Sequence, residues 1–124
     1  MVWIATCKMS AEDKKRKAHR ALIRRVLEGD GRSAQAQRRA AFDNAQTSEP
    51  LRTLIGKVAG QPTRIADEDF TAVKASGLSE DEIFEIVICA AVGQATRQYE
   101  AALGALAEAD PEMTEGRDAS RDPQ

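Results

Sequence analysis

Aromatic residues are scarce in this chain of 124 residues, where they make up 4% of the sequence as one Trp, one Tyr and three Phe. Runs in which β-branched or aromatic residues alternate with polar ones are also missing. That absence argues against a β-sandwich or a β-barrel. A core built mainly from Ala, Leu, Ile and Val is typical of packed helices. The length fits one domain, and we expect that domain to be all-α.

Cysteine is equally sparse. The two cysteines, Cys7 and Cys89, lie far apart and form neither a disulfide framework nor a Cys-x-x-Cys motif. A reducing cytoplasm is therefore the predicted location. The single histidine, His19, has no partner with which to form a metal site, and no cofactor motif accompanies it.

Long apolar runs are missing too, since none reaches the roughly 18 residues that a membrane-spanning helix needs. The opening residues, MVWIATCKMS, lack the basic region and cleavage site of a signal peptide. Because MSAEDKK resembles a natural beginning, we expect residues 1–9 to be an extension or flexible arm. Residues 10–110 are predicted to form one helical domain, and the polar, aperiodic residues 111–124 a disordered tail.

The net charge of −2 is unevenly distributed along the chain. Residues 1–60 hold 13 Lys and Arg against 6 Asp and Glu, whereas residues 61–124 hold 5 against 14. Either the basic half binds nucleic acid, or the two halves complement one another within a subunit or between subunits. Complementarity is favoured, because a phosphate backbone repels a chain that is acidic overall.

Capping residues, apolar spacing and stop signals predict about five helices and no strand. The longest has a full capping box, formed by Ser79 and Glu82. Its apolar residues surround most of its circumference, so we expect it to be buried in at least a dimer; they include Phe84, Ile86, Val87, Ile88 and Val92. The predicted helices are 11–28 after a Ser10 cap, about 34–45 after Ser33, 51–59 after Ser48 and Pro50, 67–76 before Gly77, and 80–109.

The stretch IADEDFTAVKASGLSEDEIFEIVICAAVGQATRQYEAALGAL begins at Ile65 and combines a short acidic-capped helix, Gly-Leu-Ser, further acids and a long alanine-rich helix. In that order of elements it resembles the carboxymuconolactone decarboxylase-like, or alkylhydroperoxidase D-like, family. The resemblance implies a helical bundle that assembles into oligomers. Active members of that family carry a Cys-x-x-Cys with a nearby His and Glu on the preceding helix. The equivalent region, 51–58, has neither Cys nor His, so no catalytic residue is carried over.

Cys89 is the first candidate for chemistry, with Glu85 and Tyr99 as acid–base candidates on the same helix. A helical wheel centres the inward face on Ile83, Val87, Ala90 and Gln94, and places Cys89 away from that centre. The carboxylate of Glu85, one turn before Cys89, disfavours a thiolate. We therefore favour a packing role for Cys89, together with Gly93, where two helices approach closely.

Three further features have simple structural explanations. His19 lies among Lys and Arg and is predicted to be a surface residue. The basic run from Lys14 to Arg25 lacks the interleaved aromatics of a nucleic-acid surface, which favours a solvated or docking face. The acidic clusters 67–69 and 80–82 sit at helix starts, where they act as caps rather than metal ligands.

The favoured hypothesis is a non-catalytic helical module that forms a homo-oligomer or binds another protein. The first alternative is a divergent enzyme that uses Cys89 and Glu85, or an acid–base site of Glu85 and Tyr99. The second is weak nucleic-acid binding through Lys14 to Arg25.

Overall fold

The computed structural model describes residues 2–46 and 48–109, with side chains from residue 13 onward. Within those ranges it is all-α, as predicted, and contains no strand. The elements are α1 (Val2–Glu28), α2 (Gln35–Phe42), α3 (Leu51–Gly60), the 3₁₀ turn η1 (Pro62–Arg64), α4 (Asp67–Ala75) and α5 (Glu80–Glu108). The predicted tail, 111–124, lies outside the described residues.

Helix α1 begins at Val2 rather than after Ser10. Ser10 therefore lies inside the helix, and its predicted role as an N-cap is wrong. The reason is that no Gly or Pro occurs between Val2 and Glu28, so nothing in the chain stops the helix from continuing toward the N-terminus. Whether residues 1–9 act as an arm separate from the domain stays a prediction.

The caps of α2 and α3 also differ from those predicted. Ala34, not Ser33, is the N-cap residue of α2, and no side chain caps that helix. Ser33 is buried and directs its hydroxyl toward α5 instead. Pro50, not Ser48, precedes the first residue of α3. In both places the sequence signalled a helix start correctly but named the wrong capping residue.

Helices α4 and α5 begin and end close to the predicted positions. The carboxylate of Asp69 accepts a 2.8 Å hydrogen bond from the backbone N–H of Ala66, which caps α4. Gly77 follows α4 with a φ of +109°, a backbone conformation that favours glycine. The capping box of Ser79 and Glu82 is present, and α5 extends for 29 residues.

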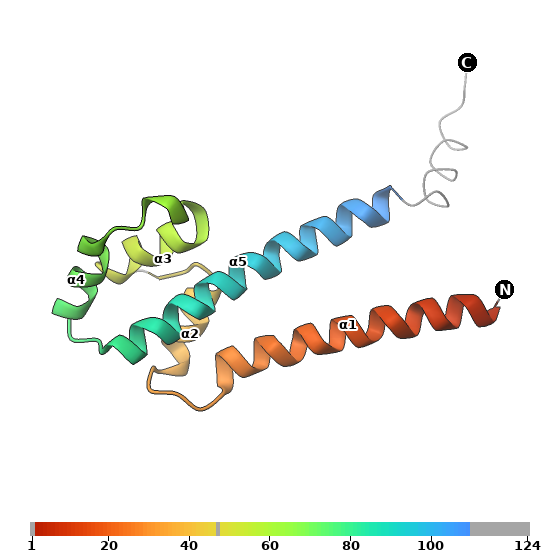
Figure 1. Ribbon diagram of the computed structural model, residues 1–124, viewed down its shortest axis with the longest axis horizontal. Helices are drawn as coiled ribbons and strands as arrows, with labels where there is room; N and C mark the ends of the chain where they lie inside the picture. The colour runs from red at the N-terminus through yellow and green to blue at the C-terminus, as the bar shows by residue number, and fades with distance from the viewer. Residues whose placement is uncertain (1, 47, 110–124) are drawn as a thin grey trace, which may run out of the picture.

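The core forms where α5 packs against α2, α3 and α4 and the C-terminal end of α1 (Figure 1). On the far side of this core, α1 and the second half of α5 project together, so that the N-terminal end of α1 and the C-terminal end of α5 lie on the same side of the core (Figure 1). Beyond Thr96 no residue of α5 is buried. The core side chains are those of Leu27, Ala41, Leu51, Leu54, Ile55, Val73, Ile83, Ile86, Cys89 and Ala90.

Candidate functional site

Cys89 lies in the core, on the buried face of α5, rather than beside it as the helical wheel predicted. Its side chain is 1% exposed, and its thiol donates a 3.2 Å hydrogen bond to the carbonyl oxygen of Val26. Burial raises the pKa of the thiol, and the negative charge of Glu85 raises it further against the opposing charge of Arg38. Such a thiol stays protonated, which does not suit a nucleophile.

This burial predicts slow thiol chemistry. In a Cys7→Ser variant, which leaves Cys89 as the remaining thiol, we expect a colorimetric disulfide reagent to react at least about 100-fold more slowly in buffer than in denaturant. The reagent must wait for the helices to open before it reaches the sulfur. Reaction at a similar rate in both conditions would show that the thiol is accessible.

Glu85 is held by the loop between α1 and α2. Its carboxylate accepts hydrogen bonds from the backbone N–H of Arg32 at 2.9 Å, and from the backbone N–H and hydroxyl of Ser33 at 2.8 and 2.7 Å. The backbone N–H bonds, first that of Arg32 and then that of Ser33, lower the pKa of Glu85 to about 2, with smaller help from Arg38. A carboxylate this acidic and this fully bonded is a poor general base.

Arg38 completes this loop anchor, a role that the sequence did not reveal. Its side chain is 5% exposed and pairs with Glu85 at 3.6 Å. It also donates to the hydroxyl of Ser33 at 2.8 Å and to the carbonyl oxygen of Gly29 at 2.6 Å. Because Arg38 and Glu85 satisfy one another and the loop backbone, their burial stabilises one geometry of the α1–α2 connection.

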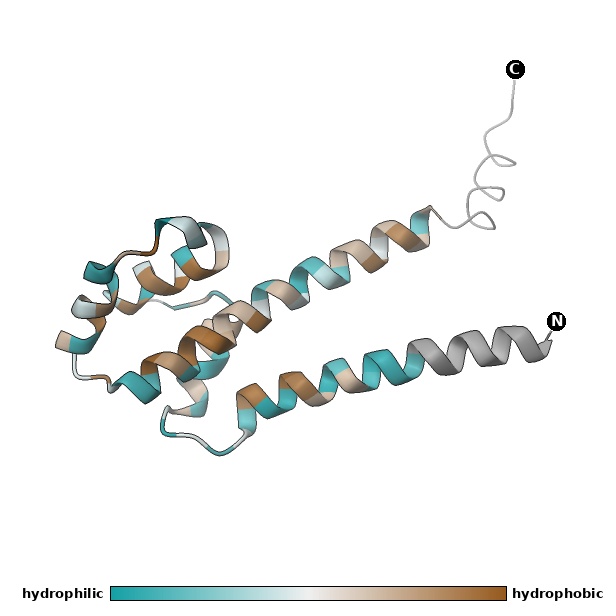
Figure 2. Ribbon diagram, in the orientation of Figure 1, coloured by the Kyte–Doolittle hydropathy of each residue, from teal (hydrophilic) through white to brown (hydrophobic). Residues whose placement is uncertain are grey.

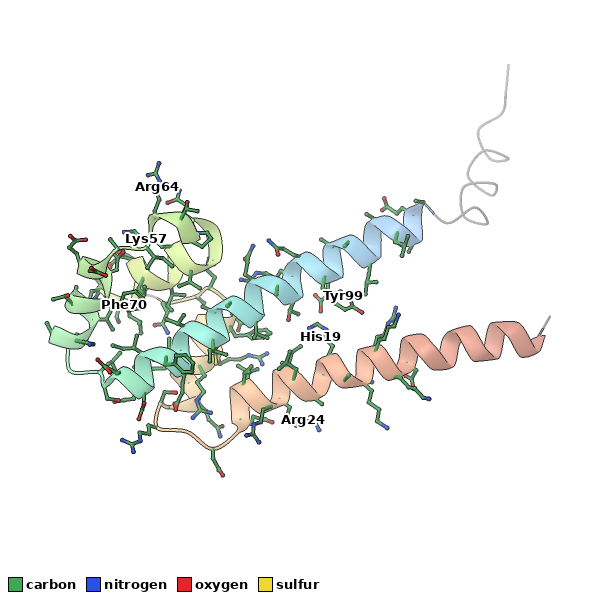
Figure 3. All side chains as sticks on the ribbon, in the orientation of Figure 1. His19, Arg24, Lys57, Arg64, Phe70 and Tyr99 are labelled. Atoms are coloured by element: carbon green, nitrogen blue, oxygen red, sulfur yellow. The ribbon has the colours of Figure 1, made fainter. Side chains whose placement is uncertain are left out.

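Tyr99 lies apart from Glu85 and Cys89, and the structure does not bring Glu85 and Tyr99 together. Fourteen residues of helix separate Tyr99 from Glu85, which is about 21 Å along α5. The Tyr99 ring instead meets His19 edge to face, with 4.9 Å between the ring centroids. Figure 3 shows these two side chains facing one another between α5 and α1.

His19 is half-buried between the helices rather than a free surface residue. Its Nε2 shares a 3.0 Å hydrogen bond with the hydroxyl of the buried Thr96. A pocket of about 280 Å³ opens beside this contact. Its lining includes Arg16, Arg20 and Glu100. The His19 contact joins α1 to α5 at the last buried residue of α5, so its geometry is that of a helix-to-helix anchor.

The charged clusters divide into two groups. At the starts of α4 and α5, Asp69 and Glu82 cap the helices. Asp69 pairs with Lys57 at 2.9 Å, and Glu80 pairs with Lys74. Among the side chains that the structure describes, no cluster of three or more potential ligands could hold a metal ion. The basic run from Lys14 to Arg25 lies on the exposed part of α1, and none of its side chains forms an ion pair within 4 Å with another side chain that the structure describes.

One face of α5 carries a row of apolar residues outside the core. Seven residues follow one another at steps of three or four positions, which places them on one side of the helix, about 120° around the helix from Cys89. None of them is charged or buried in the chain. We call this face the α5 stripe; it consists of Phe84, Ile88, Ala91, Ala95, Tyr99, Ala102 and Leu106.

The α5 stripe carries large exposed side chains at both ends. Phe84 is 66% exposed near the start of the helix, and Leu106 is 68% exposed near its end. Apolar residues thus continue along α5 past the part that packs on the other helices (Figure 2). The sequence predicts apolar residues around most of the circumference of this helix. The spacing of four, three and four positions from Phe84 onward was the signal that could have located the stripe.

A shallow groove adjoins the stripe at its Phe84 end, between α4 and α5. Its volume is about 260 Å³. Phe70, Ile83, Phe84 and Val87 supply its apolar walls, and Lys74 and Glu80 stand at its rim. Lys74 and Glu80 pair with one another, so the groove offers no free charge of its own to a ligand.

Comparison with known proteins gave no match to a family model, to a curated protein or to a solved structure. Within the described residues, every helix is too short or too polar to cross a membrane.

Proposed function

We propose that this protein is a non-catalytic helical module that assembles with copies of itself through the α5 stripe. The observation that carries the proposal is the stripe: seven consecutive outward positions without a charge, with Phe84 and Leu106 each about two-thirds exposed. Burial of a single Phe or Leu side chain stabilises an assembly by about 1.5–3 kcal/mol. A contiguous apolar face of this kind marks an interaction site.

The environments of the candidate catalytic residues support a non-catalytic role. The thiol of Cys89 is bonded to a backbone carbonyl, the carboxylate of Glu85 is occupied by the α1–α2 loop, and the ring of Tyr99 contacts His19. These three groups do not converge on a common cavity. The free, buried thiol of Cys89 is also in keeping with the reducing cytoplasm that the sequence suggests.

The resemblance to carboxymuconolactone decarboxylase-like proteins belongs to the same proposal. An all-helical chain whose long last helix follows Gly77 and the Ser79 cap is what the resemblance implies. Assembly through that helix covers the part of the α5 stripe that α1 to α4 leave exposed.

The proposal is tested by a charge placed in the middle of the stripe. Ala95→Glu introduces a carboxylate at an exposed position, so the single chain can tolerate it. In an assembly it would be buried without a partner, at a cost of several kcal/mol. We expect wild type to sediment as at least a dimer at micromolar concentration. We expect Ala95→Glu to raise the dissociation constant by roughly 100-fold or more.

Ala101→Glu is the matched control. It makes the same substitution on the same helix at another exposed position, about 120° away from the stripe. It should leave the sedimentation coefficient of wild type unchanged. A monomeric wild type, or equal effects of the two substitutions, would contradict the proposal.

A further inference from the structure

The spacing of the α5 stripe is the same when it is read in either direction, with successive steps of 4, 3, 4, 4, 3 and 4 positions. Ala95 is its central position. Phe84 and Leu106 lie eleven residues to either side of Ala95, Ile88 and Ala102 lie seven residues away, and Ala91 and Tyr99 lie four. In the two inner pairs a small residue matches a large one, and in the outermost pair two large residues match.

We infer that two copies of α5 pack antiparallel across a two-fold axis at Ala95, with Leu106 of each copy seated at the groove of the other. The inference rests on the proposed self-assembly and adds its partner surface, direction and register. In this arrangement Ile88 packs on the partner's Ala102, and Ala91 packs on the exposed edge of the partner's Tyr99, whose ring also contacts His19 of its own chain. Each large side chain on the inner positions thus meets a space left by alanine, as close helix packing requires.

The ends of the stripe support the same register. Leu106 lies against the partner's Phe84, which is one wall of the apolar groove between α4 and α5. Leu106 is 68% exposed at one end of the stripe, and the apolar groove of about 260 Å³ lies at the other end. An antiparallel pair brings them together twice, once on each side of the axis. The contact from Phe84 to Leu106 then spans about 33 Å of helix.

Charge decides between antiparallel and parallel pairing. The first turn of α5 holds Glu80, Asp81 and Glu82. A parallel pair would place these two acidic turns side by side and set Phe84 against the partner's Phe84 and alanine against alanine. Antiparallel pairing separates the acidic turns by the length of the helices and also opposes the two helix dipoles. Registers centred elsewhere on the stripe leave Phe84 or Leu106 without an apolar neighbour in the other copy.

Disulfide trapping tests the register. In a Cys7→Ser background, with Cys89 buried, Ala95→Cys places its two thiols at the axis, where the Cα atoms lie within the ~7 Å that a disulfide can bridge. Ala91→Cys is the matched control, one turn earlier on the same face. Its two Cα atoms would be offset by about 12 Å along the helices, which is too far to bridge.

We expect Ala95→Cys to form a covalent dimer on mild oxidation at least roughly tenfold faster than Ala91→Cys. We also expect both variants to sediment as dimers when they are reduced. Dimeric variants in which Ala91→Cys is trapped as fast as Ala95→Cys would overturn the register while leaving the proposed self-assembly in place. If the reduced variants and wild type all sediment as monomers, the result contradicts the proposed self-assembly and therefore the register as well.

Discussion

Replacement of Gly93 by alanine is expected to lower the free energy of unfolding by about 3 kcal/mol. Gly93 is buried where α5 crosses the end of α2. A Cβ atom at this position would overlap the carbonyl oxygen of Phe42 and lie 2.7 Å from its carbonyl carbon. The obstacle is backbone, so no flexible side chain can move aside, and α2 itself would have to shift.

The same shift would disturb a second interaction. The carbonyl oxygen of Phe42 accepts a 2.6 Å hydrogen bond from the guanidinium of Arg97, one turn beyond Gly93 on α5. Displacement of α2 therefore costs both core packing and a charge-assisted hydrogen bond. Urea denaturation followed by circular dichroism, at equal protein concentrations, measures the loss.

Gly104→Ala is the control for the glycine substitution. Gly104 lies on the exposed second half of α5, and a Cβ there would meet no atom within 4 Å. Alanine is the better helix former, so this variant should gain about 0.5–1 kcal/mol. Opposite signs for the two variants would identify close helix contact as the cause; a loss in both, or in neither, would contradict it.

The sequence located the features of this fold that depend on neighbouring residues. The capping box joins Ser79 and Glu82, which lie three positions apart, and the end of α5 is likewise predicted from residues close to it in the chain. The predicted start of α1 was wrong because Ser10 is a residue type that often caps helices. The residues before Ser10 also favour a helix, so the helix continues through Ser10. A capping residue can be recognised from its near neighbours, but whether the helix begins at that residue depends on the residues that precede it.

The candidate site could be predicted only as separate residues. Ser33 and Arg38 were not associated with Glu85 because they lie about fifty positions away in the chain. The helical wheel misplaced Cys89 because the buried face of α5 also includes Gly93 and Thr96. Small and polar residues of this kind carry little hydrophobic signal, although they allow the closest helix contacts. Tertiary packing, not periodicity, decided which face turned inward.

The loop anchor at Glu85 gives the second large expected effect. Glu85→Gln should lower the free energy of unfolding by about 2 kcal/mol at pH 7, because the ionised acceptor of three hydrogen-bond donors is replaced by a neutral amide. The buried guanidinium of Arg38 also loses its carboxylate partner. Glu100→Gln, at an exposed position of the same helix, is the control and should change stability little.

The pH dependence distinguishes this anchor from a loss of packing. Because the pKa of Glu85 is lowered from 4.5 to about 2 in the folded chain, its stabilising effect is complete above pH 4.5 and is lost as the pH falls toward 2. The gap between wild type and Glu85→Gln should therefore be widest at neutral pH and narrow steadily below pH 4.5. Denaturant midpoints measured from pH 7 down to pH 2.5 follow this gap. A gap of constant size would mean that the charge of Glu85 does not hold the α1–α2 loop, and that the amide merely fits the space less well.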